Sequence, residues 1–144
     1  MKRPIFVTLL AVLSALGQLN AAETQHPTPA HGGLNAPTKT FKNVGVAEFE
    51  KLRAGKTNVV LDVRTPAEYA AGHIPGAVNI DVTAPDFDKK VGALDASKTY
   101  LVHCKAGTRS ARACEKLEKL NFGKLYNLEG GVTAWEKAGH KTEK

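Results

Sequence analysis

From Phe41 onward, short apolar runs alternate with segments whose apolar residues recur at every third or fourth position. Runs of the first kind are typical of buried β-strands, and the second spacing is typical of amphipathic helices. The pattern predicts strands at 41–44, 58–63, 77–80, 99–103 and 125–128. It predicts helices at 46–55, 66–72, 86–94, 110–120 and 131–139. Strands that alternate with helices in this way indicate an α/β domain with a five-stranded, mainly parallel sheet and helices on both faces.

The second predicted helix opens on a start signal. Thr65 suits the N-cap, Pro66 the first helical position and Glu68 the third, which together make a capping box. Gly72 ends the helical pattern. This stretch therefore predicts a short helix with well-defined ends.

The first 22 residues follow the three-part plan of a secretory signal peptide. Lys2 and Arg3 precede an apolar run from Ile5 to Leu16, and small residues follow. This run is shorter than the roughly 20 residues that span a bilayer. We therefore expect residues 1–22 to be cleaved on export from a bacterial cell, which leaves a periplasmic or secreted protein without a membrane anchor. The alternative is an uncleaved N-terminal anchor.

Residues 23–40 are rich in Pro, Thr, Gly and Ala and show neither apolar period, which predicts a flexible leader. His26 and His31 fall within it, but two histidines make a poor metal site without further ligands. The domain itself is expected at 41–140, with a short tail at 141–144. A chain of 144 residues has room for one such domain.

The formal net charge of +6 falls to +4 if Lys2 and Arg3 leave with the signal. The remaining lysines are interspersed with acidic residues, as on a solvated helix face, and form no basic stripe. Nucleic acid is therefore not an expected partner. A mild positive field would still attract small anions, and we expect a monomer.

The stretch VHCKAGTRS, residues 102–110, joins a predicted strand to a predicted helix. Parallel sheets bind ligands beyond the carboxyl ends of their strands, so Cys104 falls where a pocket is expected. Successive N–H groups and the positive end of the following helix form a nest for an anion, to which Lys105 and Arg109 add full charges. The same field favours a thiolate nucleophile at Cys104. The alternative is a small apolar cysteine in a strand-to-helix turn.

The spacing of this loop separates two chemistries. Cys-dependent phosphatases have five residues between the cysteine and the arginine, whereas four separate Cys104 from Arg109, and Ser110 stands where their arginine would be. The shorter loop encloses about the volume of one extra sulfur atom and does not fit a tetrahedral phosphate.

Three stretches resemble the motifs of single-domain rhodaneses, which are thiosulfate-type sulfurtransferases. They are LDVRTPAEYAAGHIPGAVNI, CKAGTRSARA and LEGGVTAWEKAG, in the order and spacing of that family, and the resemblance covers about 41–139. It implies an α/β domain, a six-residue active loop and a ping-pong reaction without cofactor or metal. Sulfur would pass from thiosulfate or a similar anion, through a Cys104 persulfide, to cyanide, a thiol or a thioredoxin-like protein.

The resemblance implies that Cys104 is the nucleophile and sulfur carrier. It also implies that the remaining loop residues bind the substrate anion; these are Lys105, Ala106, Gly107, Thr108 and Arg109. Lys105 departs from the arginine often found after the family's cysteine. It keeps the charge but loses the bidentate fork, which weakens the case for a preference for thiosulfate.

Other polar and cysteine residues lie near the predicted loop or in the helix after it. Asp62 and Arg64 end a strand near the same rim, where Asp62 either holds the loop through hydrogen bonds or forms a structural ion pair. Strand alternation points His103 away from the side of Cys104, toward the core. Cys114 falls on the buried stripe of the next helix, too far from Cys104 for a disulfide, so a buried free thiol is expected.

Two alternative functions remain open at this point. A phosphatase or arsenate reductase would use the same thiol and would need a separate acid, for which Asp81, Asp86 and Asp88 are candidates. A non-catalytic rhodanese-like module that binds a partner protein is the other, although such modules often lack the cysteine.

Overall fold

The computed structural model describes residues 40–144. The predicted signal peptide at 1–22 and all of the predicted leader except Thr40 lie outside the described residues. The strands are β1 (Lys42–Val44), β2 (Val59–Asp62), β3 (Val78–Asn79), β4 (Tyr100–His103) and β5 (Leu125–Leu128). The helices are α1 (Val46–Arg53), α2 (Pro66–Ala71), α3 (Phe87–Gly92), α4 (Thr108–Lys119) and α5 (Gly131–Lys137). Each element predicted beyond Phe41 is therefore present.

The five strands form one sheet in the order β1-β5-β4-β2-β3, and every neighbouring pair is parallel. The sheet expected to be mainly parallel is thus parallel throughout. All residues of the central strand β4 are buried, in keeping with its apolar run. Two parallel strands need a long crossover connection between them. Each such connection here contains a helix, and the helices cover both faces of the sheet.

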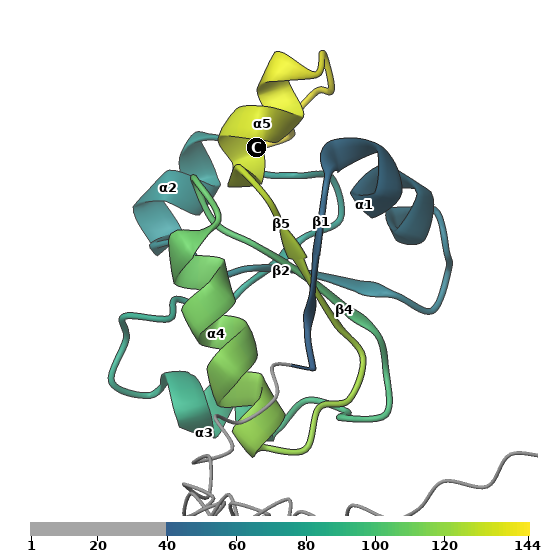
Figure 1. The fold of residues 1–144 in the computed structure, drawn as a ribbon. Helices are drawn as coiled ribbons and strands as arrows, with labels where there is room; N and C mark the ends of the chain where they lie inside the picture. The colour runs from purple at the N-terminus through teal and green to yellow at the C-terminus, as the bar shows by residue number, and fades with distance from the viewer. Residues whose placement is uncertain (1–39) are drawn as a thin grey trace, which may run out of the picture. The chain divides into compact units, whose positions relative to one another are not determined.

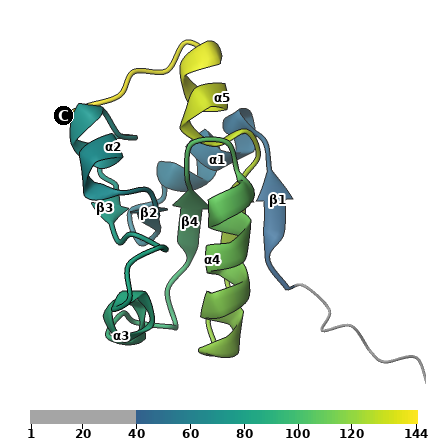
Figure 2. The ribbon, with the colours of Figure 1, turned by 90° about the vertical axis from the view of Figure 1, so that its left-hand side faces the viewer.

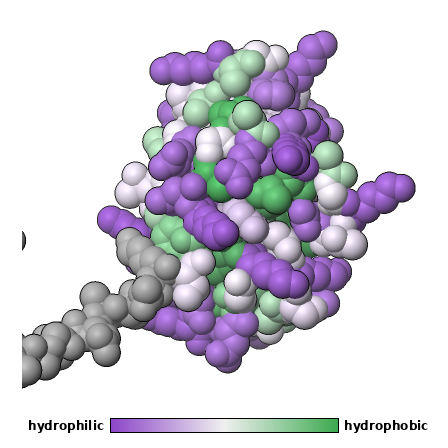
Figure 3. Space-filling view, turned by 45° about the vertical axis from the view of Figure 1, so that its right-hand side comes forward, coloured by the Kyte–Doolittle hydropathy of each residue, from purple (hydrophilic) through white to green (hydrophobic). Residues whose placement is uncertain are grey.

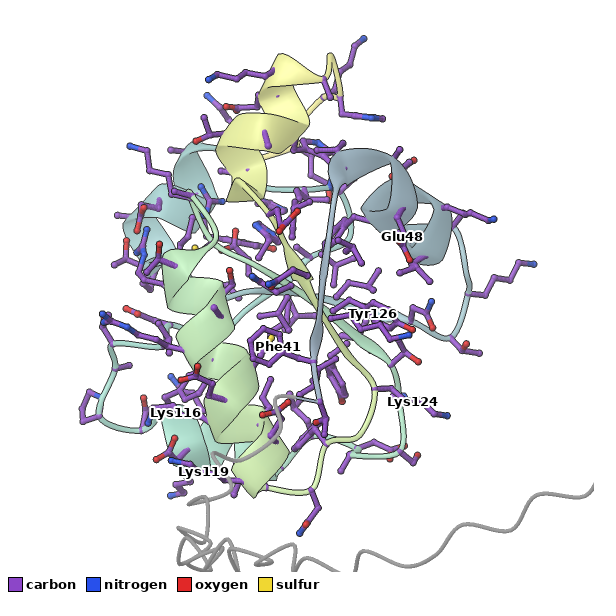
Figure 4. All side chains as sticks on the ribbon, viewed as in Figure 1. Phe41, Glu48, Lys116, Lys119, Lys124 and Tyr126 are labelled. Atoms are coloured by element: carbon purple, nitrogen blue, oxygen red, sulfur yellow. The ribbon has the colours of Figure 1, made fainter. Side chains whose placement is uncertain are left out.

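Helices α3 and α4 cover one face of the sheet, and α1 lies behind the other (Figures 1 and 2). The buried side chains form two clusters that match these faces. One contains Cys114 and Leu117 of α4, and the other contains Phe49 of α1 and Trp135 of α5. Figure 4 shows Phe41, which directly precedes β1, beside α4, and Tyr126 of β5 on the side of α1, so this part of the sheet contributes residues to both layers.

The capping box predicted for α2 is present. The Thr65 hydroxyl accepts a hydrogen bond from the N–H of Glu68 at 3.3 Å, and the Glu68 carboxylate accepts one from the N–H of Thr65 at 3.2 Å. Gly72 ends the helix. Both ends of this short helix are thereby set by its own sequence, which fixes the position of Glu68.

Both ends of the described chain are hydrogen-bonded to the domain. At the start, Glu118 of α4 accepts bonds from the N–H groups of Thr40 and Phe41, at 2.5 and 2.6 Å. Residues 141–144, predicted as a tail, follow the last helix and pair with the turn after α2. His73 and Glu143 exchange two backbone hydrogen bonds, of 2.8 and 2.9 Å. The packed domain therefore extends at least to Glu143.

On the side of α1, hydrophilic residues cover much of the surface, and small apolar patches show between them (Figure 3). Among residues 40–144, the large apolar side chains that remain exposed are Val78 and Leu120. Within the same range, none of the helices combines the length and the hydrophobicity of a membrane span.

Candidate active site

Cys104 lies in the turn between β4 and α4, at the edge of the sheet where a ligand site is expected. The residue is 1% exposed. Its Sγ accepts hydrogen bonds from the N–H of Gly107 at 3.1 Å and from the hydroxyl of Ser110 at 3.4 Å. Gly107 has a φ of +99°, which glycine adopts without strain. The loop therefore curls around the sulfur and directs donors at it.

Two opposing influences set the ionisation of Cys104. Burial by itself raises the pKa of the thiol. Hydrogen bonds from the Ser110 hydroxyl and from the N–H groups of Ser110, Ala106 and Gly107 lower it, and together they bring the pKa below its ordinary value. Donors that point at the sulfur stabilise the thiolate over the thiol. The setting thus favours the nucleophilic form.

Ser110 was not among the residues predicted to take part in the site. Its hydroxyl is buried and also donates to the carbonyl oxygen of Gly107 at 3.0 Å, so its orientation is fixed. A hydroxyl residue in the first turn of a helix that follows a reactive cysteine is the signal that would have found it, because that turn faces the thiol.

The first turn of α5 supports the loop from behind. The N–H groups of Val132 and Thr133 donate to the carbonyl oxygens of Cys104 and Lys105, at 2.8 and 3.1 Å. Gly131 approaches so closely that a Cβ there would lie 2.3 Å from the Cys104 oxygen. Gly131 of LEGGVTAWEKAG therefore allows the backbone of α5 to pack on the backbone of the loop.

Arg109, predicted to shape the anion pocket, directs its guanidinium to Glu68. The two groups form a bidentate pair, with both N···O distances at 2.7 Å. The hydrogen bonds from Arg109, assisted by those from Thr65, hold the pKa of Glu68 at about 2. Glu68 therefore neutralises the charge of Arg109 and also caps α2. Only its capping role was predicted from the sequence.

Lys105 lies at the rim of a cavity of about 260 Å³ between α2 and α5. Glu68, Ala71 and Gly72 line the side of α2, and Val132, Thr133 and Glu136 line the side of α5. Ala106 and Thr108 are exposed on the loop. The structure thus places the predicted loop residues around Cys104 and sets Lys105 facing an open pocket.

Asp62 and Arg64 form a buried ion pair. Arg64 donates two hydrogen bonds from Nε and one from Nη2 to the Asp62 carboxylate, at 2.5 to 3.0 Å, and a further bond of 2.8 Å from Nη2 to the Gly72 carbonyl. Of the two expectations for Asp62, the ion pair is confirmed, and no hydrogen bond runs from its side chain to residues 104–109. Arg64 still reaches the cavity wall. The pair therefore fixes the turn after α2.

His103 points into the core, as strand alternation predicts. Its ring meets that of Phe49 edge-on, with 6.4 Å between centroids. Burial, which outweighs the opposing effect of the nearby Asp62 carboxylate, lowers the pKa of His103 to about 4. The ring is therefore neutral at pH 7 and faces away from the sulfur, so His103 has no place as a general base for Cys104.

Cys114 is a buried free thiol on α4, as expected, and Cys104 is also free. Burial raises the pKa of the Cys114 thiol far above its ordinary range.

The three aspartates that were candidates for a separate catalytic acid each have another partner. Asp81 accepts a hydrogen bond from the hydroxyl of Thr83, Asp86 pairs with Lys90, and Asp88 pairs with Lys116. The described residues contain no group of three His, Cys, Asp or Glu side chains arranged to hold a metal ion.

A family model described as "Rhodanese-like domain" matches residues 45–138, which include the loop and the turn behind it. The chain belongs to this family. The match runs from α1 to the end of α5, so it covers almost all of the domain described above.

Some curated relatives of this rhodanese-like chain carry sulfurtransferase names, and others do not. The protein named "Putative sulfurtransferase YtwF" of Bacillus subtilis is 40% identical over 97 residues, which are 67% of this chain and 91% of that protein. A protein of Allochromatium vinosum named "Sulfurtransferase" is 32% identical over 81 residues, 56% of this chain and 74% of the relative. A tRNA uridine(34) hydroxylase of Pelagibacter ubique is 34% identical over 114 residues, 77% of this chain but 38% of that protein.

Solved structures agree with the fold. A rhodanese-related protein from Thermoplasma volcanium superposes with a TM-score of 0.63 at 31% identity, covering 71% of this chain and 97% of the other. A rhodanese-like domain protein from Staphylococcus aureus gives a TM-score of 0.57 at 34% identity, covering 65% of this chain and 90% of the other. The rhodanese-like fold is therefore established, together with relatives named for sulfur transfer.

Proposed function

We propose that this rhodanese-like protein is a sulfurtransferase in which Cys104 carries the transferred sulfur. The observation that carries the proposal is the geometry at Sγ, where the Gly107 N–H and the Ser110 hydroxyl both donate to a thiol whose pKa is lowered. The names of the relatives support the same class of reaction.

In the first half of the proposed reaction, the Cys104 thiolate attacks the outer sulfur of thiosulfate. The bond between the two sulfur atoms of thiosulfate breaks, and sulfite leaves with the bonding electrons. The outer sulfur keeps its negative charge and becomes the end of the new Cys104 persulfide. Loop N–H groups that stabilise a thiolate also stabilise this anion, since they are fixed before the reaction begins.

In the second half, an acceptor attacks the outer sulfur of the persulfide. With cyanide, the carbon–sulfur bond of thiocyanate forms, the bond to Sγ breaks, and Cys104 returns as a thiolate. Both halves are nucleophilic substitutions at sulfur, so the proposal includes neither a cofactor nor a metal. Sulfur transfer is favoured over phosphate ester hydrolysis because the loop is one residue too short for phosphate and because Ser110 stands where a phosphatase has its arginine.

The test is an assay of purified residues 23–144 with thiosulfate and cyanide, in which thiocyanate is followed over time. Cys104→Ser should abolish the product, whereas Cys114→Ala, the matched change at the buried thiol, should keep it. A phosphate monoester serves as the second substrate. Phosphate release that depends on Cys104 would contradict the proposal, and so would the absence of thiocyanate with thiosulfate and with inorganic polysulfide as donors.

We also propose that the protein is exported and acts as a monomer in the periplasm or outside the cell. The signal-like pattern of residues 1–22 supports export. Expression of the full chain, followed by cell fractionation and mass analysis of the mature N-terminus, tests this. A product confined to the cytoplasm with Met1 retained would contradict it.

A further inference from the structure

The cavity between α2 and α5 lies against the active loop. Lys105, which lines it, directly follows Cys104. Val132 and Thr133 line it too, and their N–H groups bind the carbonyl oxygens of Cys104 and Lys105. A persulfide places its outer sulfur about 2 Å beyond Sγ. A molecule in this cavity would therefore lie against the residue that follows Cys104 and against the turn that binds the Cys104 backbone.

The charges around this cavity fall into two groups. Glu68 is bound to Arg109, and Arg64 is bound to Asp62 and to the Gly72 carbonyl. Lys105 and Glu136 are exposed, and no ion pair or hydrogen bond of their side chains occurs within residues 40–144. One cation and one anion therefore remain available to a ligand, on different elements of the wall.

Between these charges the wall is small and apolar, formed by Ala71, Gly72 and Val132. The volume of about 260 Å³ is just below the usual range of small-molecule pockets, which begins at about 300 Å³. Such a space suits an aliphatic molecule about the size of an amino acid or a short peptide. A purely anionic ligand would meet the unpaired carboxylate of Glu136 as well as Lys105, so the charges do not match it.

We propose that this cavity binds a zwitterionic low-molecular-weight thiol as the sulfur acceptor, with its carboxylate on Lys105 and its ammonium on Glu136. The inference rests on the proposed sulfur transfer and adds the class of acceptor to it. The acceptor thiolate attacks the outer sulfur of the Cys104 persulfide. A new sulfur–sulfur bond forms, the bond to Sγ breaks, and Cys104 leaves as a thiolate while the acceptor departs as a persulfide.

Four thiols test the two charged groups of such an acceptor one at a time. L-Cysteine carries both groups, cysteamine only the ammonium, 3-mercaptopropionate only the carboxylate, and 2-mercaptoethanol neither. The protein is loaded with thiosulfate or polysulfide, and the loss of the Cys104 persulfide is followed by rapid quenching and intact mass. The ratio of the variant rate to the wild-type rate is taken for each thiol, so that differences in thiol reactivity cancel.

Glu136→Gln should slow discharge by cysteine and cysteamine about three- to tenfold more than discharge by 3-mercaptopropionate, because one partly exposed charge contact is lost. Lys105→Gln should slow cysteine and 3-mercaptopropionate by a similar factor relative to cysteamine. Glu48→Gln, a matched change on the exposed face of α1, should act on all four thiols alike.

Equal ratios for all four thiols in both pocket variants would overturn the assignment of the cavity while leaving sulfur transfer intact. Failure of the wild-type protein to form a persulfide with either donor, or to yield thiocyanate with cyanide, would instead contradict the proposed function itself. The two failures are therefore distinguishable in one experiment.

Discussion

Arg109 donates a hydrogen bond of 2.7 Å to each carboxylate oxygen of Glu68. The pair joins the end of the active loop to the first turn of α2, across 41 positions of the sequence. The same carboxylate also accepts hydrogen bonds from Thr65. Glu68 therefore connects the active loop to the N-cap of α2. Because Arg109 is paired with Glu68, Lys105 is the loop cation that has no ion pair among the described residues.

Replacing Glu68 by Gln should lower stability and change its dependence on pH. Contact with Arg109 lowers the pKa of Glu68 from 4.5 to about 2, so the ionised carboxylate stabilises the folded state above pH 4.5. That contribution is lost as the pH falls from 4.5 toward 2. At pH 7 the variant should be less stable by about 1–2 kcal/mol, since a charge-assisted bidentate pair is weakened. Urea unfolding at a series of pH values measures both effects.

Two features make this substitution informative. Gln can still serve at the third position of a capping box, so the loss reports mainly on the pair with Arg109. Glu136→Gln, an exposed carboxylate on α5, should change stability by no more than about 0.5 kcal/mol. If the Glu68 variant and the wild type lost stability in parallel below pH 4.5, the ion pair with Arg109 would not be a source of the pH dependence of stability.

Replacing Ser110 by Ala should move the ionisation of Cys104 to higher pH. The Ser110 hydroxyl donates to Sγ at 3.4 Å and helps to lower the pKa of the thiol. Without it, less thiolate is present at neutral pH, and thiocyanate formation at pH 7 should fall about three- to tenfold. The loss should be smaller at high pH, where the thiolate forms in both proteins.

The thiolate of Cys104 can be followed directly by its ultraviolet absorbance during a pH titration. We expect the absorbance of the Ser110 variant to rise at higher pH than that of the wild type. A variant whose titration coincides with the wild type, but whose rate is lower at every pH, would show that Ser110 acts on something other than ionisation.

Replacing Gly131 by Ala should disrupt the loop. A Cβ at Gly131 would lie 2.3 Å from the Cys104 oxygen and 2.6 Å from the carbonyl carbon of Lys105, and the residue has a φ of +56°. Gly139 has a φ of +86°, but a Cβ there would meet no other part of the protein within 4 Å. Gly139→Ala therefore measures only the cost of holding a non-glycine residue at a positive φ, about 1–3 kcal/mol. Gly131→Ala should be clearly less stable than that control by urea unfolding. Equal stabilities would contradict the close packing of the two turns.

The two cysteines should differ sharply in reactivity. Hydrogen bonds favour the thiolate at Cys104, whereas burial raises the pKa of Cys114. Iodoacetamide at neutral pH should therefore modify Cys104 first in the folded protein, and both residues after denaturation. Peptide mapping by mass spectrometry gives the two rates. Equal modification of both residues in the folded protein would contradict the assigned environments, and a Cys104–Cys114 disulfide would indicate a redox role.

Local sequence signals were sufficient for the elements and for the loop. The capping box of Thr65 and Glu68 acts between neighbouring residues, and the position of the turn from Cys104 to Arg109 is marked by its own glycine and the helix after it. Apolar runs of the correct length gave the strands. These features depend on contacts within a few residues, so the sequence pattern contains them.

Contacts across the fold were not accessible in the same way. Glu68 meets Arg109, and His73 meets Glu143, only because the strand order β1-β5-β4-β2-β3 brings α2 beside the loop and the end of the chain. The alternation of strands and helices does not specify that order. For the same reason the sequence left open whether Asp62 would bind the loop or Arg64.

The central claim is that Cys104 accepts a sulfur atom, and the most direct measurement is the mass of the protein after reaction with thiosulfate. The reduced protein is mixed with thiosulfate without acceptor, freed of excess reagent, and digested for peptide mapping. The account predicts one added sulfur atom on the peptide that contains Cys104, removed by cyanide with release of thiocyanate and absent from Cys104→Ser. No added sulfur at Cys104 with thiosulfate or polysulfide, or a cyanide-labile sulfur on Cys114 instead, would contradict it.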